Sequence, residues 1–249
     1  MTDAWRQKAI DHMIAAYPAE GCGLVVRPKG KRSLVFYPCE NLDAAPGHRF
    51  AMDPEGYALA EDSGTVVAVV HSHPDEPARA SEADKVMCEA SQLPWHILRI
   101  DGKGLEDPEF VDWVQIEPNG FKAPLVGREF SYGILDCYTL LQDYYEQEMG
   151  QRLPDFDHGP DGWWDDETSD FDPYMQHFEE AGFYEIPKPA ERGDLILMQI
   201  RSKAHKMNHA GVYIGDGLML HHLHGHLSTR EVYGGYWAQM TRKILRRKE

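Results

Sequence analysis

The chain has 249 residues, of which 42% are hydrophobic and 11% aromatic, and this composition indicates a folded globular protein long enough for two domains. Its 41 acidic and 25 basic residues give a net charge of −16, and acids are in excess in both halves of the sequence. This charge argues against nucleic-acid binding, which needs a positive field. The basic segment RKILRRKE at 242–249 is expected to be a solvated tail.

The first twenty residues carry charges throughout and lack the continuous apolar core of a signal peptide. No stretch approaches the roughly 20 apolar residues of a membrane-spanning helix, so we expect no membrane insertion. The cysteines lack CxxC spacing and indicate no disulfide framework. We therefore expect reduced thiols and synthesis in the cytoplasm. The four cysteines are Cys22, Cys39, Cys88 and Cys137.

Residues 1–118 are predicted to form one α/β unit, because amphipathic segments alternate with β-branched runs. The predicted helices cover 5–16, 54–62 and 81–92, and the predicted strands cover 23–27, 33–37, 65–71, 95–101 and 110–116. The sequence Pro118-Asn119-Gly120 marks a break, and residues 119–129 are expected to be a linker.

The strand predicted at 65–71 leads into the sequence His71-Ser72-His73. Side chains two residues apart on a strand point to the same face, so both imidazoles can converge on one point. Asp84 follows in the first turn of the next predicted helix, with Ser81 as its N-cap. Two histidines and one carboxylate with an open fourth position are typical of catalytic zinc. The alternative is that these residues are ordinary strand-end histidines and a helix-start acid.

The first unit contains HSHP, followed after six residues by SxxD, and a Glu in the upstream segment PAEGCG. This pattern resembles the JAMM (MPN-type) metallopeptidase signature. This resemblance implies that His71, His73 and Asp84 hold Zn²⁺. It also implies that Glu20 acts on the metal-bound water and that Ser81 stabilises the oxyanion. Zinc lowers the pKa of its water to about 7, and a nearby carboxylate can take the proton.

Residues 130–249 are predicted to form a second unit. Asp136 is the predicted cap of a helix at 137–149. The segment 155–172 has eight acids and no Lys or Arg, and it is expected to be a surface loop or lid anchored by Trp163 and Trp164. A helix at 173–181, a strand at 194–200 and a hairpin around Gly215–Gly217 complete the prediction.

The segments YGILDCYTLLQDYY, GDLILM and NHAGVYIGDGLMLHH resemble the NlpC-type papain-like cysteine peptidases. The resemblance implies Cys137 as nucleophile, His209 as base and His221 as the third member of the triad, with Tyr132 as an oxyanion tyrosine. A cysteine at a helix N-terminus favours the thiolate, so we expect a depressed pKa for Cys137. A neighbouring histidine can pair with the thiol, and the third member orients that histidine. Taken alone, Cys137 would be read as a buried structural cysteine.

The hairpin register decides whether the two histidines can meet. With a three-residue loop at Gly215–Gly217, Ile214 pairs with Leu218, and His221 lies on the same face as His209. A two-residue loop without a bulge would place them on opposite faces. A rival metal site in HHLHGH is weaker, because strand alternation splits its histidines between two faces. Those histidines are His221, His222, His224 and His226.

The order of the two units resembles the tail assembly proteins of lambda-like bacteriophages. It implies an α+β or α/β fold, with a JAMM-type mixed sheet followed by a papain-like NlpC α+β domain. It also implies a zinc peptidase and a Cys-His-His endopeptidase acting on peptidoglycan stem peptides or on tail proteins. Other tail-tip proteins would be partners, and the protein would join the virion tail tip. The alternatives are a structural tail component with inactive sites, or a cellular isopeptidase that uses the first unit alone.

Overall fold

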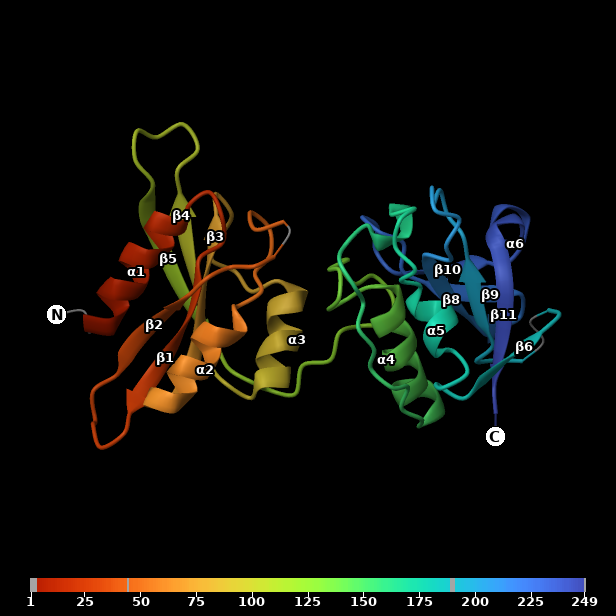
Figure 1. Ribbon diagram of the computed structural model, residues 1–249, viewed down its shortest axis with the longest axis horizontal. Coiled ribbons are helices and arrows are strands. Elements are labelled where there is room, and N and C mark those ends of the chain that lie inside the picture. The colour runs from red at the N-terminus through yellow and green to blue at the C-terminus, as the bar shows by residue number, and fades with distance from the viewer. Residues whose placement is uncertain (1–3, 44, 189–190, 249) are drawn as a thin grey trace. The chain divides into compact units, whose positions relative to one another are not determined.

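The computed structural model describes residues 4–43, 45–188 and 191–248. The chain folds as two compact units, residues 1–122 and 123–249. Each unit contains one β-sheet with helices packed on it, which confirms the predicted mixed α and β fold class (Figure 1). Within the described residues, no helix is both long and apolar enough to cross a membrane.

The first unit is built on a five-stranded mixed sheet with the order β2-β1-β3-β4-β5. Strands β3 and β4 are parallel, and the other neighbours are antiparallel. The helices are α1 (Ala4–Ala16), α2 (Pro54–Ser63) and α3 (Glu82–Ser91), and the strands are β1 (Cys22–Pro28), β2 (Val35–Cys39), β3 (Gly64–Pro74), β4 (Trp95–Asp101) and β5 (Glu109–Ile116).

Helices cover both faces of this sheet, α1 on one face and α2 and α3 on the other (Figure 1). Side chains of β3 alternate between the two cores: Val70 packs in the α1 core, and Val69 packs in the α2 and α3 core. β3 runs three residues beyond its predicted end, so His71 and His73 are both strand residues. By the same alternation they face α3, which carries Asp84.

The second unit is built on an antiparallel sheet with the order β10-β9-β8-β7-β11-β6. Leu140 and Leu141 of α4 pack on this sheet against Leu197 and Ala210. The helices are α4 (Cys137–Met149), α5 (Pro173–His177), α6 (Gly235–Met240) and the 3-10 helix η1 (Trp163–Asp165), and the strands are β6 (Phe183–Ile186), β7 (Leu195–Met198), β8 (His209–Gly215), β9 (Leu218–His221), β10 (Thr229–Val232) and β11 (Thr241–Arg247).

The prediction of a solvated basic tail is wrong, because residues 241–247 form β11 between β7 and β6. Leu245 is buried in the core, and Arg246 donates two hydrogen bonds of 2.8 Å to Asp194. Lys243 and Arg246 therefore have carboxylate partners that are distant in sequence. The helix predicted at 173–181 is also shorter, since α5 ends at His177. Residues 178–182 form turns, the last of them at Gly182 with φ of 85°, before the chain enters β6.

The core position of Leu141 gives a stability prediction. Leu141 is fully buried, so Leu141→Ala is expected to lower the free energy of unfolding of the second unit by about 2–5 kcal/mol. Leu227 is 57% exposed, and Leu227→Ala should change this free energy by no more than about 0.5 kcal/mol. Urea unfolding followed by tryptophan fluorescence measures both, and equal effects would contradict the assigned core.

Candidate active sites

In the first unit, His71, His73 and Asp84 bring three possible metal ligands together. The Nε2 atoms of His71 and His73 are 3.0 Å apart, and they lie 3.1 Å and 3.4 Å from the two carboxylate oxygens of Asp84. Around tetrahedral zinc, with bonds of about 2.0–2.1 Å, neighbouring ligand atoms lie roughly 3.3 Å apart. The donor set therefore fits a divalent metal ion. Among the described residues it is the one group of this kind, so the histidines at 221–226 form no such cluster.

The surroundings of the two histidines orient their rings. Nδ1 of His73 lies 3.1 Å from the carbonyl oxygen of Pro77, so an Nδ1–H donor there leaves the Nε2 lone pair free for a metal. The ring of His71 is stacked on Phe50 and meets Trp95 edge-on. This aromatic packing holds the fully buried His71 ring in one orientation.

Ser81 and Asp84 form the capping box of α3. The Ser81 hydroxyl donates to a carboxylate oxygen of Asp84 at 2.8 Å and accepts from the Asp84 amide at 3.0 Å. Burial opposes the charge of Asp84, but the charges and hydrogen bonds of His71 and His73 outweigh it and lower its pKa. In this arrangement Ser81 orients a metal ligand, and its oxyanion role stays a prediction.

Glu20 lies just before β1 and next to the histidine strand. The hydroxyl of Ser72 accepts a hydrogen bond from the Gly21 amide at 2.9 Å, and the Ser72 amide donates to the Gly21 carbonyl at 3.0 Å. The serine between the two histidines therefore fixes the Glu20 segment beside them. Burial raises the pKa of Glu20 to about 8, and the nearby charge of His73 opposes this rise. A buried carboxyl group with this pKa can hold or release a proton near neutral pH.

In the second unit, Cys137 is the first residue of α4, as predicted, and Asp136 is its N-cap. One carboxylate oxygen of Asp136 accepts from the amides of Tyr138 and Thr139, and the other accepts from Gly133. That second oxygen also lies 2.8 Å from Nδ1 of His158. The helix start that carries the sulfur is therefore held by four hydrogen bonds to one buried carboxylate.

The expected depressed pKa of Cys137 is wrong for this structure. Burial, together with the charge of Asp136, raises the pKa of the Cys137 thiol to about 12. Hydrogen bonds from the Tyr174 hydroxyl and from the Ala210 and Cys137 amides oppose this rise. The thiol is therefore neutral at rest. Burial also raises the pKa of Cys22 and Cys39, so none of these three thiols is activated.

His209 and His221 are brought together by the β8–β9 hairpin. Nε2 of His209 lies 3.0 Å from Nδ1 of His221. Gly215, rather than Ile214, pairs with Leu218, and a bulge at Ile214 restores the register that places His221 opposite Gly211. The predicted three-residue loop is wrong in detail, but the bulge that the alternative required is present. Burial lowers the pKa of His209 to about 3, so its ring is neutral.

His221 has an acidic neighbour, Glu231. Nε2 of His221 lies 3.9 Å from a carboxylate oxygen of Glu231, which accepts a hydrogen bond from the Trp237 indole at 2.7 Å. The Trp237 ring also packs edge-on against His221, with ring centroids 4.5 Å apart. A proton on Nε2 of His221 would face this carboxylate and leave Nδ1 as an acceptor for His209.

No hydrogen bond joins Cys137 to His209 among the residues that the structure describes. The nearest link is the Ala210 amide, one residue from His209, which lies against the Cys137 sulfur. Sγ of Cys137 instead lies 3.2 Å from the hydroxyl of Tyr174. The sulfur and the histidine pair thus occupy neighbouring positions on α4 and β8, with the sulfur engaged by a tyrosine.

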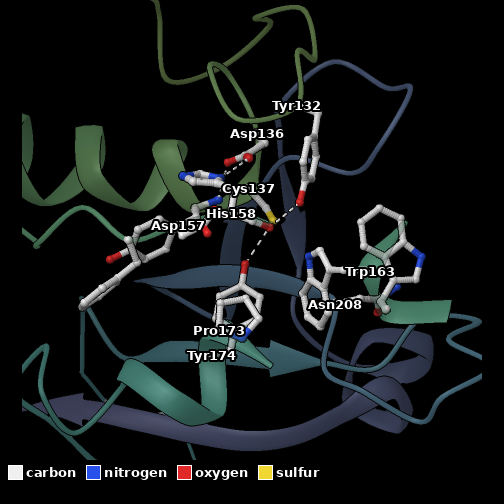
Figure 2. Close-up of a pocket in the computed structure, with 12 residues that line it drawn as sticks. Tyr132, Asp136, Cys137, Asp157, His158, Trp163, Pro173, Tyr174 and Asn208 are labelled. Carbon is white, nitrogen blue, oxygen red and sulfur yellow. Dashed lines mark hydrogen bonds and ion pairs between the residues drawn. The ribbon is translucent and has the colours of Figure 1, made fainter. Parts of the chain in front are cut away.

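Cys137 opens into a pocket that is largely aromatic (Figure 2). Tyr174 and His158 line it, and sequence reasoning missed both, because no periodicity or motif marks them. Tyr132 also lines the pocket, but its hydroxyl donates to the carbonyl of His158 at 2.5 Å. Trp163 is buried and confirms its predicted role as an anchor of the acidic segment. The remaining lining residues are Asp136, Tyr138, Phe156, Asp157, Trp164, Pro173 and Asn208.

The sequence matches two known domain families. Residues 2–114 match the prokaryotic homologs of the JAB domain, which is JAMM-related, and residues 127–246 match the NlpC/P60 family. The protein is therefore of the class that joins a JAB-like domain to an NlpC/P60 domain of the cysteine-peptidase type.

Two bacteriophage proteins are similar over most of the chain. Tail tip assembly protein K of Escherichia phage N15 is 44% identical over 250 residues, which cover 98% of this chain and 96% of that protein. Tail tip assembly protein K of Escherichia phage lambda is 36% identical over 196 residues, which cover 78% of this chain and 88% of that protein. The chain belongs to the tail tip assembly protein K family of phage tail assembly proteins.

Similarity to solved structures is weaker. An NlpC/P60 family protein from Bacillus cereus is 12% identical with a TM-score of 0.35, over 97% of this chain and 66% of that chain. A protein from Desulfitobacterium hafniense is 26% identical with a TM-score of 0.34, over 47% of this chain and 89% of that chain. Neither comparison carries an argument about the two sites.

The neutral thiol gives a prediction about labelling. Iodoacetamide reacts with thiolates, and burial raises the pKa of Cys137 to about 12. We expect native Cys137 to react more slowly than free cysteine at pH 7.5, with a rate that rises about tenfold per pH unit. Timed quenching and peptide mass spectrometry measure the rate. Rapid modification at mildly acidic pH would instead demonstrate an imidazolium–thiolate pair.

Proposed function

We propose that this phage tail assembly protein carries two peptidase sites, a zinc-dependent site in the first unit and a Cys-His-His site in the second. The observation that carries the proposal is that the fold gathers both sets of residues from separate elements. His71, His73 and Asp84 converge from β3 and α3. The second set pairs its two histidines across the β8–β9 hairpin, beside the N-terminus of α4 that carries the cysteine.

The cysteine site would act by general-base activation of a neutral thiol. His209 is neutral and would take the proton of Cys137 as the sulfur attacks a peptide carbonyl. The resulting imidazolium would donate from Nε2 to Nδ1 of His221. It would then give its proton to the leaving amine, and water would release the acyl group. Charge therefore forms only when a substrate occupies the site.

In the first unit, His71, His73 and Asp84 would hold zinc and leave one position open. Bound zinc supplies Lewis-acid chemistry and a water of lowered pKa. Glu20 would take up a proton beside the site and pass it to the leaving amine, a role that fits its burial and its pKa of about 8. Ser81 would act first by orienting Asp84, and its contact with an oxyanion is the finer part of the proposal.

Peptidoglycan stem peptides are the proposed substrate of the cysteine site, since NlpC-type enzymes typically cut next to D-γ-glutamyl residues. A protein with a net charge of −16 is not drawn to an anionic wall by its overall field. Attachment to other tail-tip proteins would supply the high local concentration that the free protein lacks. Tail proteins are the alternative substrate, above all for the zinc site.

A structural tail component with resting or inactive sites is the second candidate. The specific observation that favours it is the raised pKa of Cys137, together with the absence of a described hydrogen bond between its sulfur and His209. Turnover by the wild-type protein separates the two candidates.

The zinc site predicts one ion per chain. Purified wild-type protein is expected to contain one equivalent of zinc by mass spectrometric metal analysis, and His71→Ala should reduce it to below about 0.1 equivalent because a ligand is lost. Glu20→Gln should retain zinc but lose activity, since Glu20 is assigned to proton transfer. His48→Ala removes an exposed histidine of the same unit and serves as the control. Full zinc in His71→Ala would place the site elsewhere.

The cysteine site predicts cleavage within the stem peptide. Wild-type protein should release peptide fragments slowly from purified sacculi, and Cys137→Ala should abolish this release by removing the nucleophile. His73→Ala should leave it unchanged, since His73 belongs to the other unit. Mass spectrometry of the fragments identifies the cut bond. Cut glycan strands with intact stems, or no release under any metal or reducing condition, would favour the structural role.

A further inference from the structure

The hydroxyl of Tyr174 is the side-chain group that meets the Cys137 sulfur. Its oxygen lies 3.2 Å from Sγ, and Figure 2 shows the hydroxyl pointing across the pocket at the sulfur. Tyr174 belongs to α5, which follows the acidic segment 155–172, so neither domain motif in the sequence includes it.

Packing fixes the position of this hydroxyl. Asp172 caps α5 by accepting from the Met175 amide at 3.1 Å. The Tyr174 ring packs against the main core of the second unit and meets the Tyr138 ring edge-on. The hydroxyl is therefore presented by a capped helix that is attached to the core, and not by a free loop.

Tyr132, the tyrosine expected at the oxyanion, has its hydroxyl engaged elsewhere. It donates to the carbonyl of His158 at 2.5 Å (Figure 2). Of these two pocket tyrosines, Tyr174 is the one whose hydroxyl is hydrogen bonded to the sulfur of Cys137.

The environment of the sulfur makes such a donor necessary. The surroundings of Cys137 are buried and largely aromatic, and the carboxylate of Asp136 adjoins them, so a negative charge there is disfavoured. Burial raises the pKa of Tyr174 well above its usual value, so the phenol keeps its proton and can act only as a donor toward an anion. The Ala210 amide provides a second donor beside the sulfur.

We propose that Tyr174 is a further catalytic residue of the cysteine site, whose hydroxyl donates to the Cys137 sulfur as it loses its proton and then to the oxyanion of the tetrahedral adduct. This inference rests on the proposed cysteine-peptidase function. The oxygen of the adduct is bonded to the carbon that the sulfur attacks. A donor at 3.2 Å from Sγ can reach that oxygen when the substrate carbonyl is oriented toward Tyr174.

With a peptide substrate, protons and electron pairs would move between Cys137, His209 and the scissile bond. The proton of Cys137 passes to His209 while the S–C bond forms, and the π electron pair of the carbonyl moves to its oxygen. Tyr174 donates a hydrogen bond to that oxygen and keeps its own proton. When the carbonyl reforms, the C–N bond breaks, and the proton on His209 goes to the leaving amine.

The first test needs no substrate. Tyr174→Phe keeps the ring and removes the hydroxyl, so we expect iodoacetamide to modify Cys137 about tenfold more slowly at pH 9, because the thiolate loses a donor. Tyr138→Phe is the matched control, since its hydroxyl donates to the Pro154 carbonyl and not to the sulfur. Circular dichroism confirms that both variants fold. An unchanged or faster rate in Tyr174→Phe would overturn the proposal.

The second test uses purified stem peptides. Tyr174→Phe should lower kcat about a hundredfold and leave KM within about twofold, because the donor acts on the adduct more than on the bound substrate. An unchanged kcat would overturn the oxyanion role. The two tests can also give different answers. If Tyr174→Phe is alkylated more slowly but the wild type cleaves no stem peptide, the hydrogen bond from Tyr174 to the sulfur is supported and the proposed substrate is refuted.

Discussion

The two-residue alternation of β-strands places the histidines of both sites. In β3, His71 and His73 share a face because they are two residues apart on one strand. In the second unit the histidines lie on neighbouring strands, and the bulge at Ile214 sets the register that faces His221 toward Gly211, two residues from His209. A Cβ at Gly211 would lie 3.2 Å from Cβ of His221 and only 2.7 Å from the sulfur of Met219, so glycine leaves the space that this register needs.

The carboxylate of Asp136 connects the Cys137 end of α4 to the acidic segment 155–172. It caps α4 beneath Cys137, and it pairs with His158, whose carbonyl receives the Tyr132 hydroxyl. The side-chain hydrogen bond with Asp136 raises the pKa of His158. The His158 ring therefore stays protonated, and paired with Asp136, to a higher pH than the ring of an isolated histidine. The pocket wall and the start of the helix are thus held by one buried group.

Three of the eight acids in segment 155–172 have roles in local structure. Asp157 and Asp166 accept amide hydrogen bonds from residues two positions ahead, as in Asx turns, and Asp172 caps α5. The ammonium group of Lys206 donates to the carbonyls of Asp166 and Ser169. The segment is therefore a hydrogen-bonded wall of the pocket that contains Trp163 and leads into α5, which carries Tyr174, and its charge need not serve to attract a ligand.

The sequence predicts α4 at its observed bounds and β3 as far as His71, because an N-cap residue and a β-branched run are local signals. It does not predict β11, because Arg246 in that strand is neutralised by Asp194, which lies 52 residues away in the sequence. The Tyr174–Cys137 contact spans 37 residues and depends on a segment without periodicity, so no spacing rule could reveal it. Residue types and order identify the chemistry, but tertiary contacts decide the state of the thiol.

The two candidate sites contain different groups that could stabilise a negative charge in buried surroundings. Peptide hydrolysis creates negative charge on an oxygen, and both sites lie in buried surroundings where such charge is costly. In the first unit the convergent imidazoles and carboxylate provide a place for a cation. In the second, the neutral pair of Cys137 and His209 carries no resting charge, and neutral donors at Tyr174 and Ala210 surround the sulfur. A site of this kind needs no favourable long-range field, which is consistent with the net charge of −16 of this chain.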